Sequence, residues 1–444
     1  MRLDFQRLFN VRRDEALPVI LSVVFFFCIL TALMMLRPAR EALGMQRGID
    51  SVRWLFIGTA VITLLVNPVF GSLVSRLKRM QFVAITYLFF ALSLVGFYLL
   101  MTLSPAAIGV TTGQVFYVWF SVFNLFATMV FWALMADRFS LEQSKRFFAL
   151  IAVGGTLGAV FGPWLASILA NRIGTPALLL VSSAFLLLAV GAAWAISRLQ
   201  PAVGHEHAKV REDDLIGGGA WDGVKAVFQS RYLLGIAAYV VILAVMATLL
   251  YFTRLQMVAA LGHELDARTT LFAQIDVITQ VATLVIQLLV AGRLMKRFGV
   301  HITLAILPLT CLLGFVGLAI VGSLAALIVF EAAFRAVQRA IMRPARETLF
   351  TVMSRDDKYK SKAFIDTFVY RAGDVTGAQL EGGLARLGMG LVAIASVAVP
   401  LTLVWAALAL WLGRTQQRLA AASDHDQAQT SAHFSSPTTQ RTSL

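Results

Sequence analysis

Long apolar segments alternate with short polar ones along almost the whole chain. Each apolar run has about 20 residues, the length that an α-helix needs to cross the hydrocarbon core of a bilayer. The pattern predicts an all-α, polytopic membrane protein with twelve transmembrane helices. The predicted spans are residues 16–36, 54–73, 81–103, 113–135, 147–170, 176–198, 232–253, 269–291, 301–320, 324–345, 363–385 and 389–412.

The composition supports this prediction. Hydrophobic residues make up 59% of the 444 positions and charged residues 14%, with a mean hydropathy of +0.78, outside the range of soluble globular proteins. The first apolar run is too long for a cleaved signal peptide, and LRPARE follows it where a small-residue cleavage site would stand. We therefore expect this run to remain as the first span.

Residue clusters that could carry out catalysis or hold a metal are sparse. Cys28 and Cys311 fall in different spans, so they predict neither a disulfide framework nor a metal site. His205 and His207 have no third ligand nearby, which favours a solvated loop. No Ser-His-Asp, paired acidic or Cys/His constellation is placed for catalysis. We expect no enzyme activity, no cofactor and no nucleic-acid partner.

Positive charges are concentrated in alternate loops. The N-terminus, the loops after spans 2, 4, 6, 8 and 10, and the tail hold 27 of the 38 Lys and Arg residues, whereas the opposite loops hold 8. By the positive-inside rule, both termini are predicted to be cytoplasmic. We expect a monomer in a bacterial inner (cell) membrane, and the net charge of +14 then needs no acidic macromolecule to explain it.

A stripe of charges interrupts the tenth span. Glu331, Arg335, Arg339 and Arg343 recur every four residues and Arg346 follows, so they share one helix face. Each Arg at bilayer depth costs about 2.5–3.5 kcal/mol, so the stripe is predicted to face an aqueous cavity, a protein neighbour or an anionic ligand. A simpler interpretation pairs Glu331 with Arg335 and puts Arg343 and Arg346 at the cytoplasmic mouth.

Two other spans carry acidic residues. Asp276 is a lone carboxylate in span 8, which suits either a salt bridge to a cavity Arg or a protonatable coupling group. In span 11, Asp366, Tyr370 and Asp374 recur every four residues, and Arg371 can neutralise Asp374. The candidate coupling or gating residues are Asp276, Glu331, Asp366, Arg371 and Asp374.

A heptapeptide that closes the first span recurs at the tenth. RPAREAL at residues 37–43 matches RPARETL at 343–349 in six of seven positions. The Pro in each copy is predicted to kink or end its helix, which would bring freed carbonyls and guanidinium groups together, as in broken helices that line binding sites. The candidate substrate-binding residues are Arg37, Arg40, Arg335, Arg339, Arg343 and Arg346.

Glycines in span 5 follow a small-xxx-small pattern. Gly154, Gly155, Gly158 and Gly162 predict close helix packing, because no strand precedes them and no Gly-Lys-Ser/Thr follows, as a phosphate-binding loop requires.

Short basic loops stand at equivalent places six spans apart. Residues 71–79, GSLVSRLKR, and 292–299, GRLMKRFG, resemble the Gly-x-x-x-Asp-Arg-x-x-Arg-Arg loop of the major facilitator superfamily, with Ser75 at the usual position of the acid. The resemblance implies two six-helix bundles with a binding site between them. The expected regions are a cytoplasmic segment 1–15, bundles 16–198 and 232–413, a cytoplasmic central loop 199–231 and a disordered tail 414–444.

Three stretches resemble the ATP:ADP antiporter (nucleotide transporter, NTP/NDP exchange) family. Residues 142–159, EQSKRFFALIAVGGTLGA, are similar to its Glu-Ala-Lys-Arg-Phe-Tyr segment. Residues 358–373, KYKSKAFIDTFVYRAG, resemble its Lys-Tyr-Lys-Ala-Lys-Ala-x-Ile-Asp and Arg-x-Gly, and LRPAREAL resembles its Leu-Arg-Asp-Thr-Lys-Asp-Val-Leu. By position, Arg40 corresponds to a substrate-site Lys, whereas Asp374 stands where members that exchange ATP have a Lys.

The resemblance and the surplus of Arg imply a secondary active transporter of an anionic, phosphorylated solute, such as a nucleotide, working by alternating access. Arg side chains bind phosphate or carboxylate bidentately. Two alternatives remain open: a proton-coupled major-facilitator transporter of another organic anion, and a non-transporting membrane scaffold or assembly protein. The expected partners are the anionic small molecule and the lipid bilayer.

Overall fold

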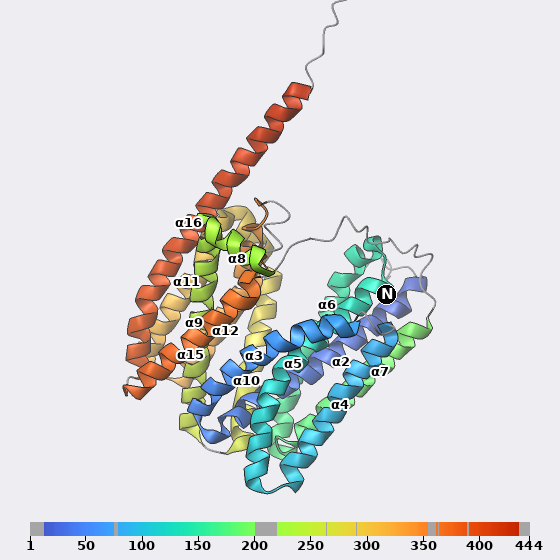
Figure 1. The fold of residues 1–444 in the computed structure, drawn as a ribbon. Helices are drawn as coiled ribbons and strands as arrows, with labels where there is room; N and C mark the ends of the chain where they lie inside the picture. The colour runs from blue at the N-terminus through green and yellow to red at the C-terminus, as the bar shows by residue number, and fades with distance from the viewer. Residues whose placement is uncertain are drawn as a thin grey trace, which may run out of the picture. The chain divides into compact units, whose positions relative to one another are not determined.

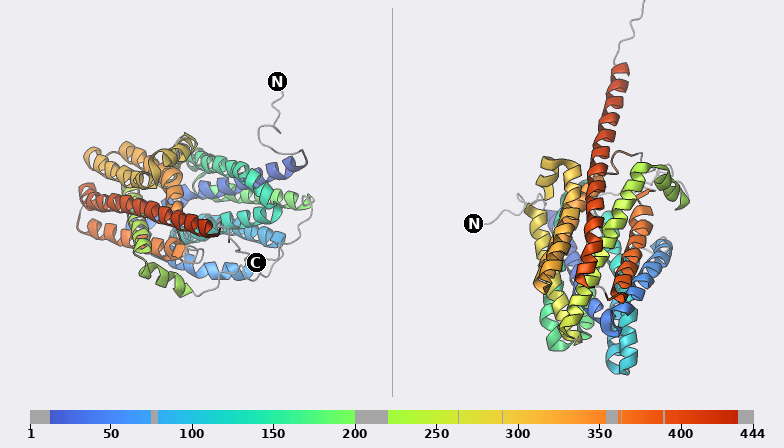
Figure 2. Two further views of the ribbon diagram at one scale, coloured as in Figure 1. Left: turned by 90° about the horizontal axis from the view of Figure 1, so that it is seen from above. Right: turned by 90° about the vertical axis from the view of Figure 1, so that its left-hand side faces the viewer.

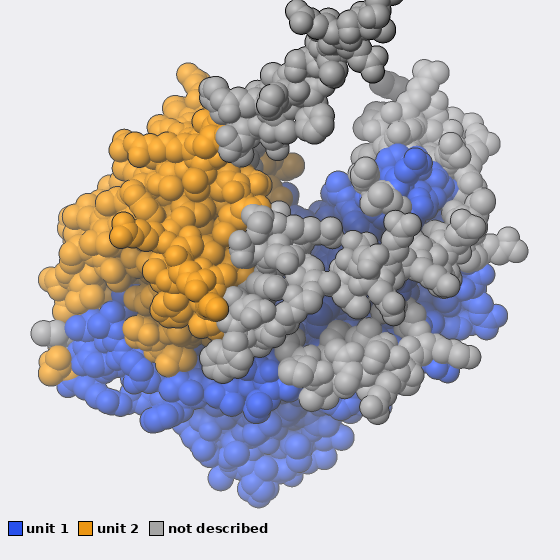
Figure 3. Space-filling model, turned by 45° about the horizontal axis from the view of Figure 1, so that its top comes forward, with its two compact units in different colours: residues 1–215, 249–284, 378–386 blue, residues 216–248, 285–377, 387–444 orange. Residues whose placement is uncertain are grey.

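The computed structural model describes residues 13–74, 79–199, 220–262, 264–289, 291–353, 361–362, 364–388 and 390–434. Every regular element in these ranges is a helix (Figure 1), which confirms the all-α fold class. The contacts between residues divide the chain into two compact units, coloured separately in Figure 3.

Unit 1 comprises residues 1–215, 249–284 and 378–386. Its helices from the first part of the chain are α2 (Arg13–Gly44), η1 (Met45–Arg47), α3 (Ile49–Val74), α4 (Arg79–Leu103), α5 (Ala106–Arg138), α6 (Leu141–Ile173) and α7 (Ala177–Arg198). It also holds the end of α9 (Arg231–Leu261), most of α10 (Leu265–Leu289) and the end of α15 (Tyr370–Arg386). Side chains from distant parts of the sequence therefore meet inside this unit.

Unit 2 comprises residues 216–248, 285–377 and 387–444. Its helices are α8 (Ala220–Gln229), the first part of α9, α11 (Ala291–Val321), α12 (Leu324–Val337), α13 (Arg343–Thr348), the first part of α15, and α16 (Leu391–Phe434). Two π-helical turns, η3 (Gln338–Met342) and η4 (Ile365–Val369), also belong to it. Helix α16 packs along α11 and continues beyond it as one helix (Figure 2).

Ten helices in the described ranges are long and apolar enough to cross a membrane. The two predicted spans outside this set, 324–345 and 363–385, are helical but interrupted. In the first, α12 is followed by the π-turn η3, which ends at Met342, two residues before Pro344. A proline ring clashes with the carbonyl four residues earlier, and a wider π-turn relieves such a clash.

The helix around the matching proline in α2, Pro38, is not interrupted. The sequence predicts a kink or a helix end at Pro38, yet α2 continues through Pro38 to Gly44 without a break in its helical assignment. Transmembrane helices tolerate a proline where neighbouring groups or local adjustment satisfy the freed backbone carbonyl. The prediction of a helix end at the first copy of the heptapeptide is therefore wrong.

The glycine stripe of α6 packs directly against α2, as predicted. A Cβ atom on Gly154 would lie 2.3 Å from the carbonyl oxygen of Val23, and one on Gly158 would lie 2.4 Å from that of Phe27. Distances this short leave no room for a side chain, so the two backbones are in near contact. This close packing limits the rotation of α2 about its own axis, and so sets the direction of the helix face that carries Arg37 and Arg40.

The end of the chain differs from the sequence-based expectation. Helix α16 runs to Phe434, whereas a disordered tail is predicted from residue 414. Ala, Gln and Arg, which are good helix formers, dominate residues 414–422 and allow the helix of the last span to propagate. Residues 1–12, 200–219 and 435–444, which include His205 and His207, lie outside the described ranges.

Candidate functional site

The last turns of α2 place three charged side chains on one face. Arg37, Arg40 and Glu41 are spaced i, i+3 and i+4, so they lie together on the helix surface. Arg37 and Arg40 keep only 15% and 14% of their side-chain surface exposed. Arg37 Nε lies 3.7 Å from Asp276 Oδ2 on α10. The sequence left two roles open for Asp276, a salt bridge to an Arg and a protonatable coupling group. The structure shows the salt bridge.

Arg254 on α9 joins this group from the opposite side. Its side chain is 0% exposed, with Nη1 at 3.3 Å from Asp276 Oδ1 and Nη2 at 3.8 Å from Glu41 Oε1. The sequence analysis missed Arg254 because span 7 was predicted to end at residue 253, which counted it as a loop charge. The apolar pattern of LQMVAAL after Arg254 was the available signal, since α9 continues to Leu261.

These five charged residues form what we call the α2 charge cluster. It consists of Arg37, Arg40, Glu41, Arg254 and Asp276. Three guanidinium groups therefore share two carboxylates, and each carboxylate contacts two of them. Buried charges are stable only when they are paired and hydrogen-bonded, so the cluster has one cation more than its own acids neutralise.

Two tyrosines complete the surroundings of Glu41 and Arg40. Tyr251 donates a hydrogen bond to Glu41, and its hydroxyl lies 2.9 Å from that of Tyr117 on α5. The guanidinium carbon of Arg40 lies 3.8 Å from the centre of the Tyr117 ring. A Cβ on Gly44 would lie 2.6 Å from that ring, so a glycine is needed here for Tyr117 to reach Arg40.

Arg40 retains donor capacity. Its Nη1 donates to Glu41 Oε1 at 3.2 Å, while its buried Nε has no hydrogen-bond partner among the described residues. Stacking on a ring leaves the edge of a guanidinium group open to an acceptor. An oxyanion placed at this edge would satisfy the buried donor.

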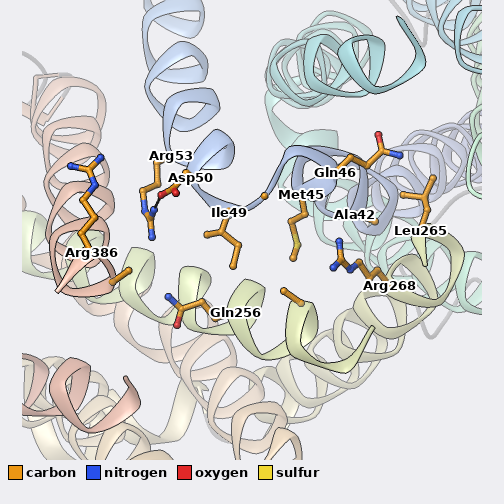
Figure 4. A pocket seen from close by; sticks show the side chains of 13 residues that line it. Ala42, Met45, Gln46, Ile49, Asp50, Arg53, Gln256, Leu265, Arg268 and Arg386 are labelled. Carbon is orange, nitrogen blue, oxygen red and sulfur yellow. Dashed lines mark hydrogen bonds and ion pairs between the residues drawn. The ribbon is translucent and has the colours of Figure 1, made fainter. Parts of the chain in front are cut away.

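A second ion pair in unit 1 lies at the start of α3. Arg53 donates from Nε and Nη2 to Glu381 Oε2 of α15 at 2.9 and 2.7 Å. Asp50 also contacts Arg53, and Gln256 of α9 donates to Glu381. A cavity of about 590 Å³ lies at this end of the unit (Figure 4). None of the α2 charge cluster lines it.

The stripe predicted in span 10 lies in unit 2, distributed over α12, η3 and α13. Arg335 Nε donates to Glu331 Oε1 at 2.7 Å, which is the i, i+4 pair of the simpler interpretation. Arg339 is half-buried within the π-turn, and Arg343 is exposed. Arg346 is buried and lies 3.0 Å from Asp366 Oδ1 of η4, a pair that the sequence did not predict.

The polar face of α15 lies beside this stripe. Arg371 Nη1 donates to Asp374 Oδ2 at 3.0 Å, as the i, i+3 spacing predicts, and Thr248 donates to Asp374 Oδ1 at 3.4 Å. Unit 2 therefore has its own polar face, on which Glu331, Asp366 and Asp374 each contact an Arg.

The described residues contain no group of three or more His, Cys, Asp or Glu side chains arranged to hold a metal ion. Cys28 and Cys311 are both free thiols. Ion pairs between Arg and carboxylate side chains recur in the polar contacts of both units.

Comparisons with known proteins agree on the fold. A sequence profile of the Major Facilitator Superfamily matches residues 19–342. No curated protein matches the chain in a sequence search. Among solved structures, a mutant of the nucleoside transporter NupG aligns with a TM-score of 0.60 at 12% identity, covering 90% of this chain and 99% of that chain.

Two further solved structures are similar. A bacterial homolog of the human lysosomal transporter Spinster has a TM-score of 0.61 at 13% identity, covering 92% of this chain and 98% of that one. A POT family transporter bound to a peptide conjugate has a TM-score of 0.60 at 10% identity, with 89% and 96% covered. Because the family profile spans well over half of the chain, the protein belongs to the Major Facilitator Superfamily and is a secondary transporter of that type.

Proposed function

We propose that this transporter carries an anionic, phosphorylated organic solute, with nucleotide exchange of the ATP:ADP antiporter type as the leading case. The observation that carries the proposal is that, within the described ranges, the buried guanidinium group of Arg40 has an unsatisfied donor. Its one described ion-pair partner, Glu41, also contacts Arg254 and Tyr251, and its buried Nε has no acceptor within the part of the chain that the structure describes. A bound oxyanion would supply that acceptor and neutralise the additional cation of the α2 charge cluster.

The phosphate preference rests on two further arguments. Arg binds phosphate through a planar fork of donors, and both units carry Arg side chains on their polar faces. The similarity of residues 142–159 and 358–373 to the ATP:ADP antiporters supports a nucleotide. We further propose alternating access between bundles 16–198 and 232–413, in a monomer with cytoplasmic termini in a bacterial inner membrane.

A ligand panel tests this proposal most directly. Thermal unfolding of the purified protein is followed with nucleotides, other phosphorylated metabolites and unphosphorylated organic anions. A ligand stabilises the folded state in proportion to its occupancy, so phosphorylated anions are expected to raise the unfolding temperature most. Stabilisation by none of them would oppose the proposal and favour a scaffold protein.

Arg40→Gln is expected to lower solute counterflow in proteoliposomes by about tenfold or more, because one charge-assisted hydrogen bond contributes about 1.5–3 kcal/mol. Arg40→Lys keeps the charge and is expected to retain more activity. Arg47→Gln is the matched control, because Arg47 is exposed and donates hydrogen bonds to Gln114 and Thr111, away from the α2 charge cluster. Equal counterflow in Arg40→Gln and Arg47→Gln would contradict the role of Arg40.

The double variant Arg335→Ala with Arg339→Ala is expected to abolish counterflow, because it removes two cations from the polar face of unit 2. Replacement of both by Lys preserves the charge and is expected to retain part of the activity. Counterflow is measured with radiolabelled solute at saturating internal concentration. Full retention in the Ala variant would remove these residues from the mechanism.

A second candidate function is proton-coupled transport of another organic anion. The observation that favours it is Asp374, which stands where the resembling exchangers have Lys and is held by Arg371 and Thr248. An imposed pH gradient is expected to drive uptake in this case and to leave strict exchange unaffected. Loss of the gradient response in Asp374→Asn, with exchange retained, would assign the coupling to this residue.

A further inference from the structure

The cavity of about 590 Å³ in unit 1 lies apart from the α2 charge cluster, none of whose residues lines it. It lies where α2 passes through η1 into α3, facing α9, α10 and α15. Its volume falls within the range of small-molecule sites, roughly 300–1,000 Å³. Its lining includes Met45, Ile49, Arg53, Gln256, Arg268 and Arg386.

Arg side chains line the cavity at two separate positions. Arg53 and Arg386 lie at one end in Figure 4, and Arg268 lies toward the other, near Gln46 and Leu265. The contacts of Arg53 with Asp50 and Glu381 balance its charge. Arg268 is held in place because its Nε donates to the Gly262 carbonyl at 2.7 Å. Arg268 and Arg386 therefore place one guanidinium group toward each end of the cavity.

The wall between these ends is largely apolar. Met45 and Ile49 lie between the two Arg ends in Figure 4, with the amide of Gln256 beside them. A ligand matched to this lining carries a negative group at each end and a neutral or apolar body between them. Guanidinium groups bind carboxylates as well as phosphates.

We propose that this cavity is a binding site for an elongated organic dianion, separate from the transport site, and that its occupation inhibits transport. Its walls come from both proposed bundles: α2, η1 and α3 precede residue 199, whereas α9, α10 and α15 follow residue 231. Alternating access moves one bundle against the other. A ligand in this cavity that contacts both bundles stabilises the conformation in which the cavity is formed. It therefore opposes the separation of the two bundles at this cavity.

A series of α,ω-dicarboxylates from succinate to sebacate tests the proposal by thermal shift on the purified full-length protein. Stabilisation is expected to pass through a maximum at the length that joins Arg268 to Arg386, and to be weaker for the half-amide of the same length. Arg386→Gln, at an exposed position, is expected to raise the dissociation constant of the best dianion about tenfold or more.

Arg268→Gln gives a second variant at the other end of the cavity, and Arg47→Gln is the control outside it. Equal stabilisation of the wild type, Arg386→Gln and Arg268→Gln would overturn the site. Equal stabilisation by dianion and half-amide would overturn the ligand class.

Inhibition is measured as counterflow of the transported solute at increasing dianion concentration. The dianion is expected to lower the maximal rate in the wild type and to have at least tenfold lower potency in Arg386→Gln. Binding without any effect on rate would overturn the inhibitory role. Arg40→Gln is expected to keep dianion binding, so a failure of the proposed transport site and a failure of this cavity give different results.

Discussion

Asp276→Asn is expected to lower the free energy of unfolding by about 3–5 kcal/mol, the cost of leaving buried charges without their partner. Asp276 contacts both Arg37 and Arg254, and Arg254 is fully buried. Without this carboxylate, Arg37 and Arg254 would each lose an ion pair. The change is measured by chemical unfolding in detergent micelles, with Glu142→Gln, at an exposed position on α6, expected to stay within about 0.5 kcal/mol of the wild type.

A double variant separates charge balance from the loss of a hydrogen bond. Asp276→Asn combined with Arg254→Gln restores the original excess of one cation in the α2 charge cluster. It is expected to be more stable than Asp276→Asn alone, because residues of one ion-pair network couple strongly. A double variant no more stable than the single one would show that the charge count of the cluster does not govern its stability.

Gly158→Val is expected to destabilise the protein by about 3 kcal/mol, at the upper end of the usual cost of overpacking. A Cβ at this position would lie 2.4 Å from Phe27 O and 3.0 Å from Thr31 N. Both are backbone atoms, so α6 and α2 would have to separate to make room for the new side chain.

Gly191→Val on α7 is the matched control for this prediction. A Cβ there meets no atom within 4 Å, so the same substitution is expected to change the unfolding temperature little. Both variants are compared by thermal unfolding in the same detergent. Similar melting temperatures for the two would mean that close contact of α2 and α6 contributes little to stability.

The sequence predicts contacts well where helical spacing alone determines them. The pairs Glu331 with Arg335 and Arg371 with Asp374 are three or four residues apart on one helix, and both are present. The close approach at Gly158 likewise follows from a stripe of small residues, because only a neighbouring helix can use the space they leave.

Contacts between distant helices could not be predicted in the same way. Helical periodicity identifies the polar face of a span but not the neighbouring helix against which that face packs. The sequence therefore did not identify the partners of Asp276 and Arg346. Arg254 was missed for a related reason. A charged residue at the end of an apolar run resembles a loop residue in the sequence, and only the structure shows its contacts with Glu41 and Asp276 on other helices. The two copies of the heptapeptide also differ, since only Pro344 follows a π-turn.

The lengths of α2 and α9 have a consequence for how the protein responds to its lipids. They have 32 and 31 residues, or about 46–48 Å at 1.5 Å per residue, against a hydrocarbon thickness of about 30 Å. Such helices tilt or project beyond the acyl chains. Arg37 and Arg254 lie in the final third of these helices and are enclosed by other side chains, so changes in acyl-chain length should alter tilt while leaving their ion pairs intact.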